Sequence, residues 1–446
     1  MFIQRQQLLT WILLIALVMR VASDDTANLS YLVIGTYALL GRSQVIQALV
    51  LSCLFTMINP GISPDVSATS IGRYLVIGCA VLSVFMRSKV LREGRIVGVL
   101  SLQTFLLGLF LVAHSFLFSS VVDVSVLKAF SWTVTMTTLV AAWSGLRMRQ
   151  RESLSRQIFG GLILLMFVSL PFIFLQVGYL RNGTGFQGVL NHPQAFGLTM
   201  ALLGAWAASR IAGEKVPPWS MVMIAVACLV LVVMSEARTA GLALVLGVGC
   251  ALIAASWLAG RPARLVLPGL YNKRIYILGI IVLLGGVLTG PTLVNKIDGY
   301  LSKRVDAMSL AEAYEVSRGK LIFTMVDNIQ TKPFLGIGFG VASDLSLMEI
   351  SREPVLGIPV GTAIEKGVLP LAVLEEVGVV GFGAIMAWVW VLLRRSSSLG
   401  VSNLAVTMTA LLLNMGEYTL FSPGGMGLLS LVLIAWASSS DASARR

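Results

Sequence analysis

Charged residues are scarce in this chain of 446 residues. Asp, Glu, Lys and Arg together make up 12% of it, whereas a soluble domain carries about 25%. So small a share cannot cover the surfaces of several water-exposed domains, and such an organisation is excluded. The remainder is strongly apolar, since 57% of the residues are hydrophobic and the mean hydropathy is +0.87. The composition predicts that most of the chain lies in lipid.

Cysteine and histidine are also scarce. The four cysteines all fall inside apolar stretches, so their spacing offers neither a disulfide framework nor a CxxC metal site. They are Cys53, Cys79, Cys228 and Cys250. The chain has two histidines, His114 and His192, which argues against a zinc site built on histidine. We therefore expect no metal site.

The formal net charge of +12 does not indicate nucleic acid binding. That function needs Lys and Arg clustered on one folded face together with stacking aromatic side chains. Here the basic residues sit in short breaks between apolar stretches. We expect no nucleic acid partner, and the charge is better explained by membrane topology.

Apolar stretches of membrane-helix length recur along the whole chain. A spanning helix needs roughly 17 to 25 mostly apolar residues, and about fourteen stretches are candidates. They cover approximately residues 7–22, 28–41, 44–60, 70–86, 97–119, 124–145, 158–178, 192–209, 219–234, 239–258, 275–294, 369–393, 403–421 and 424–440. If the short second stretch and the third form one re-entrant hairpin, the count becomes twelve. The expected fold class is all-α and polytopic, with about 12–14 transmembrane helices.

The first stretch, Leu8 to Ala22, has the length of a signal peptide. The residues that follow it, Ser23-Asp24-Asp25, make a poor cleavage site, so we interpret it as an uncleaved first span.

Basic residues are concentrated in every other break between the apolar stretches. Twenty Lys and Arg and four Asp and Glu fall in every other break, which puts +16 there and leaves −4 for the rest of the chain. By the positive-inside rule the basic side and both termini are cytoplasmic. The organisation predicted is an N-terminal bundle over 1–294, a large periplasmic loop over 295–368 and C-terminal helices over 369–446, all in one integrated membrane domain.

The loop over 295–368 is the one segment long enough to hold extramembrane structure. Leu310 to Thr331 is predicted as a helix, because apolar residues recur on one stripe until Lys332-Pro333 stops it. A partly amphipathic helix between two spans can lie on the membrane surface or cap the bundle. No internal repeat is visible, which argues against an inverted-repeat transporter.

Ionisable residues at membrane depth are costly, so each is a candidate for function. The set on the outer side comprises Arg20, Arg73, Asp123, Lys128, Arg181, Glu236, Arg238, Arg318, Glu365, Lys366, Glu375, Glu376 and Glu417. Arginine pairs bidentately with phosphate oxygens, so the cationic members matter most. For Arg20, Arg73 and Lys128, snorkelling to the interface is an equally good interpretation.

Two stretches of the sequence are predicted to lie at outer turns, and the first of them is rich in glycine. In the first, Arg181 to Gly197, Asn191 can cap a helix that begins near Pro193, and a helix N-terminus binds anions. A plain capped turn explains the same pattern. The second, Ser235 to Gly241, is too short for Arg238 to reach bulk water, so we expect this arginine to point into an outer cavity, with Glu236 as a possible ion-pair partner.

Two further stretches follow in the loop and at the next span. One contains Arg318 and then Pro333 to Gly340, whose GIGFG run does not form a nucleotide-binding loop because no strand precedes it. The other contains Glu365-Lys366-Gly367 and leads into the run from Glu375 to Gly378.

Together these four stretches resemble the O-antigen ligase and polymerase superfamily of bacterial polysaccharide assembly, over residues of about 160–395. The family pattern has N-x-P-x-x-x-G, a serine-to-arginine turn followed by glycine, an arginine before P-x-x-G-x-G, and an acidic-x-G-x-x-G run. The matching residues are Asn191, Pro193 and Gly197; Ser235, Arg238 and Gly241; Arg318, Pro333, Gly336 and Gly338; Glu376, Gly378 and Gly381.

The resemblance implies a GT-C-type glycosyltransferase in the bacterial inner membrane, with its active site facing the periplasm. Such proteins transfer an undecaprenyl-diphosphate-linked oligosaccharide, with inversion and without metal or other cofactor. Arg238 and Arg318 match the phosphate-binding arginines of the family. The assisting and supporting candidates are Arg181, Arg73, Lys366, Asn191, His192 and Lys128. Implied partners are the growing polysaccharide and membrane lipid, with flippase and chain-length-control proteins as further candidates.

One departure from the pattern separates two branches of the superfamily. The ligases carry a histidine about eleven residues before the acidic-x-G run, and this chain has Gly367 there, beside Glu365 and Lys366. The departure favours a Wzy-type polymerase of exopolysaccharide or O-antigen, with Glu365 as the base; a plain ion pair of Glu365 with Lys366 is the structural alternative. A ligase that transfers glycan to lipid A core or protein is the second candidate. A transporter of a lipid-linked sugar or anionic solute is the third.

Overall fold

The computed structural model describes residues 2–64, 69–88, 98–276, 319–352, 357, 359–363 and 366–439. The helices of its N-terminal half are α1 Phe2–Ala22, α2 Asp24–Ala38, α3 Arg42–Met57, α4 Thr69–Arg87, α6 Val99–Phe118, α7 Val122–Ser144 and α8 Met148–Ser169, followed by the 3-10 helices η1 Leu170–Phe174 and η2 Gln176–Gly178. The later ones are α9 Pro193–Gly213, α10 Trp219–Met234, α11 Arg238–Ala259, α12 Ala263–Val266, η3 Pro268–Tyr271, α15 Lys320–Thr331, η5 Leu345–Leu347, α16 Leu369–Leu399, α17 Val401–Leu413 and α18 Gly425–Ser438. Strands β1 Glu349–Arg352 and β2 Pro359–Ala363 pair antiparallel.

The protein is an all-α, polytopic membrane protein. Among the described helices, six are long and apolar enough to cross a membrane: α6, α7, α8 with η1, α9, α11 and α16. Five shorter apolar helices, in α1, α3, α10, α17 and α18, accompany them. The count of 12–14 spans, the sidedness and the three-part organisation remain predictions, and the span expected at 275–294 lies almost wholly outside the described residues.

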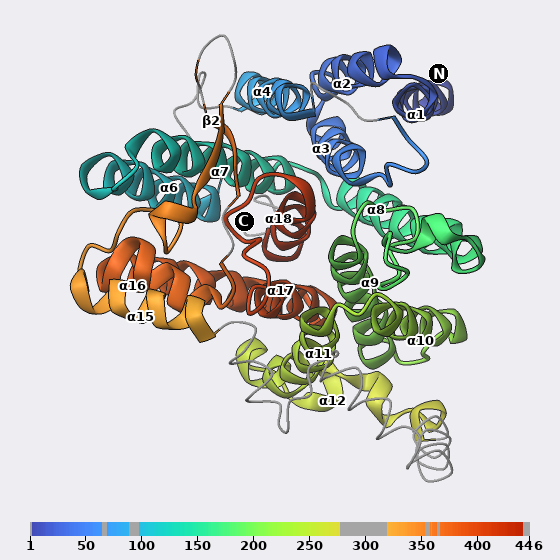
Figure 1. Ribbon diagram of the computed structural model, residues 1–446. Helices are drawn as coiled ribbons and strands as arrows, with labels where there is room; N and C mark the ends of the chain where they lie inside the picture. The colour runs from blue at the N-terminus through green and yellow to red at the C-terminus, as the bar shows by residue number, and fades with distance from the viewer. Residues whose placement is uncertain are drawn as a thin grey trace.

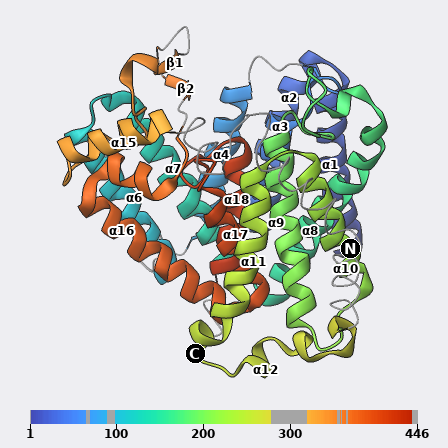
Figure 2. The same ribbon diagram turned by 60° about the horizontal axis from the view of Figure 1, so that its bottom comes forward.

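The helices run roughly side by side, and the small extramembrane elements gather at their ends. Figure 2 shows α15 and the β1–β2 hairpin at one end of the bundle and α12 at the other. Helix α9 lies inside, against α10, α11 and α17 (Figure 1), and 83% of its apolar window is buried. Small residues permit this close packing; at Gly247 of α11, for example, a side chain would overlap Thr409 of α17.

Two arginines form hydrogen bonds to the ends of helices. Both were predicted to lie on the cytoplasmic side. The last carbonyls of a helix lack intrahelical partners, and basic side chains can satisfy them. Arg42 donates to the carbonyls of Gly145 and Arg87 at 2.9 and 2.8 Å, just past α7 and at the end of α4. Arg87 in turn donates to Leu39 at the end of α2 at 2.6 Å. These basic residues therefore also join neighbouring helices.

One predicted span is shorter than expected. The stretch 403–421 is helical only to Leu413, because the side chain of Asn414 takes over the next turn. Its Oδ1 accepts from the backbone N–H groups of Thr419 and Leu420 at 2.8 and 2.7 Å, and its Nδ2 donates to Ala410. The segment 414–424 is consequently an ordered loop between α17 and α18.

Helix α16 is broken in its first half. Gly378 has φ 63° and ψ −172°, a conformation that is essentially confined to glycine. The break leaves the carbonyls of Glu375 and Glu376 without helical partners, and they accept instead from the N–H groups of Ile337 and Gly338 at 2.9 and 3.0 Å. Val379 N–H donates to the carbonyl of Pro333 at 2.9 Å, so the segment 333–340 is hydrogen-bonded along the break.

The other side of this segment is held by α6 and α7. His114 Nε2 donates to the carbonyl of Leu335 at 2.7 Å. The N–H of Ser120 donates to Ile337, and Ser125 Oγ donates to the carbonyl of Phe339 at 2.7 Å. Two of the sequence motifs, P-x-x-G-x-G and acidic-x-G, are thus bonded to each other. The predicted end of the loop helix is also confirmed, because α15 stops at Thr331 before Pro333; residues 310–318 lie outside the described residues.

We expect Gly378→Ala to destabilise the protein by about 3 kcal/mol, because the new Cβ would overlap the carbonyl of Phe334 and the backbone conformation excludes side chains. Gly383→Ala in the same helix is the matched control, since a Cβ there has open space. The measurement is the thermal melting midpoint of the purified protein in detergent. Equal midpoints for the two variants would contradict the role of the break.

Candidate functional site

A cavity of about 920 Å³ opens among the segments that connect the helices. Its wall is formed by residues 56–57 after α3, 191–195 at the start of α9, 320–324 in α15, 342–347 before the hairpin, Lys366, and 416–427 between α17 and α18. Both polar and apolar side chains line it. The cavity therefore suits a ligand that carries both polar groups and hydrocarbon.

Two helices begin at this cavity. The first turns of α9 and α18 line it, and helix N-termini carry partial positive charge from their unpaired N–H groups. Lys320 of α15 adds a cationic side chain to the wall. The electrostatic character at these points favours an anionic group in the ligand.

The cap of α9 differs from the prediction. His192, not Asn191, is the N-cap, and its Nδ1 accepts from the N–H of Gln194 at 3.2 Å. Pro193 occupies the first helical position and has no N–H, so the residue directly before it reaches the first available donor. Asn191 instead bonds the end of α3, where its N–H donates to Met57 at 2.7 Å. Asn191 and His192 both line the cavity, as supporting residues would.

Arg238 begins α11 in a tight turn beside the cavity, and its side chain is not among those that line the wall. The turn packs closely on Gly197 of α9, where an added Cβ would overlap Ala237 and Ser235. The next residue, Thr239, packs on Gly416 of the cavity wall. Arg238 is half-buried at this junction.

The carboxylate of Glu236, in the same turn, accepts from the N–H of Gly185 at 3.4 Å. This contact joins the turn to the glycine-rich stretch before α9, so two of the sequence motifs meet here.

The other predicted cations divide into two groups. Arg73 lies against Gly424 of the cavity wall and over the ring of Tyr74 at 4.9 Å, so it borders the cavity. Arg181 is exposed in the turn between Tyr179 and Phe186 and is not part of the wall.

Arg318 and Glu365 lie outside the described residues. Their close sequence neighbours Lys320 and Lys366 both line the cavity.

Two of the three residues to which snorkelling was assigned as an alternative have partners inside the protein. Arg20 is buried and donates to the carbonyls of Phe55 and Pro64 at 3.1 Å each, so it joins α1 to α3. Lys128 of α7 is half-buried, and its ammonium lies 4.9 Å from the ring centroid of Tyr418.

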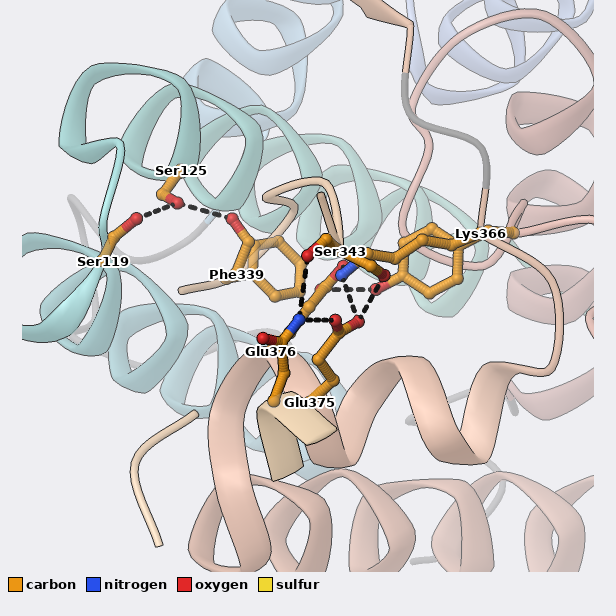
Figure 3. A network of polar contacts seen from close by, with 9 residues as sticks. Ser119, Ser125, Phe339, Ser343, Lys366, Glu375 and Glu376 are labelled. Carbon is orange, nitrogen blue, oxygen red and sulfur yellow. Dashed lines mark hydrogen bonds and ion pairs between the residues drawn. The ribbon is translucent and has the colours of Figure 1, made fainter. Parts of the chain in front are cut away.

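Lys366 belongs to a buried charge cluster with Glu375, Glu376 and Tyr418. Its ammonium lies 2.8 Å from Glu375 Oε2 and 3.2 Å from Glu376 Oε1, and all three side chains are fully buried. Tyr418 donates to Glu376 Oε2 at 2.7 Å. Figure 3 shows Lys366 and the two carboxylates turned toward one another beside Ser343. The two contacts of Lys366 lack hydrogen-bond geometry, so the attraction there is between charges.

The cluster also holds the outer segments in place. Glu375 accepts from Asn328 of α15 at 2.7 Å and from Ser343 at 2.9 Å. Burial and the neighbouring carboxylates raise the pKa of Tyr418 well above its usual range, so its hydroxyl stays a donor. Sequence reasoning missed Asn328, Ser343 and Tyr418, because no local pattern marks residues whose partner is distant in the chain.

Strained backbone adjoins the cavity at two places. Among the described residues, the non-glycine residues with positive φ are Glu236 at 55° and Val368 at 58°. One lies two residues before Arg238 and the other two residues after Lys366. Such strain persists only where the surrounding contacts enforce it, and it is concentrated at functional sites.

Two carboxylates on the wall have different surroundings. Hydrogen bonds from the side chain and the N–H of Ser346 hold the pKa of Asp344 below its usual range, which makes it a weak proton acceptor. Glu417, on the opposite loop, is half-buried. Within the part of the chain that the structure describes, no three His, Cys, Asp or Glu side chains come together as metal ligands would.

We expect Lys366→Met to lower the free energy of unfolding by about 3–5 kcal/mol, because it leaves two carboxylates buried without their cation. Lys332→Met, which removes an exposed lysine just past α15, is the control and should change little. The two variants are compared by thermal melting in detergent. A Lys366→Met protein as stable as the control would show that the cluster is not charged as described.

Comparisons with known proteins leave the family open. No protein-family model matches the chain, and no curated protein sequence matches it. The resemblance to the O-antigen ligase and polymerase superfamily therefore rests on the four motifs.

Proposed function

We propose that this protein is a Wzy-type polymerase of a bacterial surface polysaccharide, a membrane glycosyltransferase of the GT-C type. One observation carries the proposal: segments of all four motifs, distant in sequence, border or support one cavity. They are represented there by His192, by the turn of Arg238, by Lys320 after Arg318, and by Lys366 with Glu376. A set of weak motifs that converges on one cavity supports a shared function.

The ligand proposed is undecaprenyl-diphosphate-linked oligosaccharide. Its diphosphate needs positive charge, which the N-termini of α9 and α18, Lys320 and the bordering Arg238 and Arg73 supply. Its sugars need hydroxyl and amide partners, and the wall offers Asn191 and Thr419 among others. The mixed lining supports a lipid-linked sugar better than a purely hydrophobic or purely ionic ligand.

The reaction proposed is inverting glycosyl transfer. Glu365 takes the proton of the acceptor hydroxyl, whose oxygen bonds to the anomeric carbon from the face opposite the diphosphate. The bond from that carbon to the diphosphate oxygen breaks, and its electron pair leaves with the diphosphate. Arg238 and Arg318 stabilise the negative charge that develops there. The pKa of Asp344 is lowered, which makes it a weak proton acceptor. This supports assigning the role of catalytic base to another carboxylate.

A transporter is the competing class, and the break in α16 is the observation that bears on it. Transporters often bind solute at the open ends of broken helices. Here the freed carbonyls of Glu375 and Glu376 are bonded by the chain's own N–H groups, and Val379 N–H is bonded as well. At these three groups the break is closed by the chain itself, which favours the enzyme.

We expect Arg238→Ala and Arg318→Ala each to abolish polymer formation while membrane insertion is unchanged, because each removes charge from the leaving diphosphate. The measurement is the length of product formed by purified protein from lipid-linked repeat units. Arg352→Ala is the control, since its ion pair with Asp123 is nearly half exposed and contributes little. Wild-type product from both of the first two variants would refute the diphosphate assignment.

Deletion of the gene distinguishes polymerase from ligase, because the two act on different acceptors. Loss of a polymerase should leave single repeat units on the surface lipid. Loss of a ligase should abolish surface attachment while long lipid-linked polymer accumulates. The products are separated by size on gels of surface glycolipid, and the second pattern would overturn the polymerase in favour of the ligase.

A further inference from the structure

Helix α15 has one face toward the cavity and another toward α16. Lys320, Leu321 and Thr324 line the cavity. Met325 is fully buried and Asn328 bonds Glu375 of α16, so these two define the inner side of the helix. The rest of the helix circumference faces away from the protein.

The outward side carries both apolar and polar residues. Phe323 and Val326 are 69% and 37% exposed, and they lie three residues apart on one stripe, which also carries the exposed side chain of Gln330. Asp327 and Thr331, four residues apart, are exposed on the neighbouring stripe. A phenylalanine this exposed would be costly in water, whereas the polar stripe beside it needs water.

The apolar stripe continues into surface that faces lipid. Directly after α15, Phe334 and Leu335 are 68% and 44% exposed. Leu335 is bonded through its carbonyl to His114 in the last two turns of α6, a helix long enough to span. Phe116 of that same end is 68% exposed.

A second candidate span adjoins the same stripe. The bond from Val379 N–H to Pro333 joins the end of α15 to α16 at its break. Val379 and Val380 are 51% and 60% exposed on α16. Exposed apolar residues therefore lie on α15, α6 and α16 near the points where these segments are bonded to one another.

We propose that α15 is an interfacial helix whose apolar stripe, Phe323, Val326, Phe334 and Leu335, is immersed in the membrane leaflet on its own side. Under the proposed orientation this is the outer leaflet. A second copy of the chain is a poorer occupant, because four partly exposed side chains offer well under the ~800 Å² that each partner of a stable interface buries. Lipid needs no such area, since it covers the adjoining spans as well.

The consequence for substrate access rests on the proposed function. Because the opposite face of α15 lines the cavity, this one helix separates the cavity from the leaflet. A lipid-anchored substrate would then pass the first turn of α15, beside Lys320, with its hydrocarbon still in the membrane.

The test measures water access along α15 in membrane vesicles that hold the full chain. Single cysteines replace Phe323, Val326, Asp327 or Thr331, and a charged maleimide that reacts only in water labels them; the parent chain is the blank. We expect Asp327→Cys and Thr331→Cys to react about tenfold faster than Phe323→Cys and Val326→Cys, because thiols in the interface are shielded from the aqueous reagent.

Two results would overturn the proposal. Equal rates at all four positions would place α15 in water. Slow labelling at positions 323 and 326 together with cross-linked dimers through these cysteines would assign the stripe to a second copy. Labelling needs no substrate, so the two proposals can fail separately. If the labelling pattern is as expected but the protein makes no polymer, only the proposed function is refuted. If the protein makes polymer but all four rates are equal, only the interfacial helix is refuted.

Discussion

The carbonyl groups of Glu375 and Glu376 cannot be left unbonded inside a membrane protein, and the way they are bonded organises the rest of the structure. Gly378 turns the chain out of α16 and frees them, and the N–H groups of Ile337 and Gly338 bond them again. In lipid each unsatisfied backbone group costs several kcal/mol, so this exchange holds the segment 333–340 firmly against the helix. The end of the bundle that carries α15 is built around that contact.

The buried charge cluster depends on the same break. The two carboxylates precede Gly378 directly, and the cation that balances them, Lys366, comes from the segment that leads into α16. Tyr418 reaches the cluster from the loop that Asn414 orders after α17. Three walls of the cavity are thereby connected through buried charges. A cavity with such walls keeps its shape, as the proposed transfer between two sugars requires.

The same helix α15 serves the cavity on one side and, as we propose, the lipid on the other. Both roles follow from its position against α16, where Met325 and Asn328 hold it. A substrate with a hydrocarbon anchor and a polar headgroup fits a site that lies at the boundary between membrane and water. The combination of a polar cavity and an apolar outer stripe is the physical link between the two proposals.

The sequence alone determined what depends on local pattern: membrane character from scarce charge, most helix ends, and the end of α15 before Pro333. It also singled out Arg238 and Glu376, because charged residues at membrane depth are conspicuous. Only the tertiary structure decided which distant residues meet. It brought Tyr418 to Glu376, made His192 the cap of α9, and left Arg181 on the surface. Pairings of this kind depend on how the chain turns at Gly378 and Asn414, and no periodicity in the sequence records them.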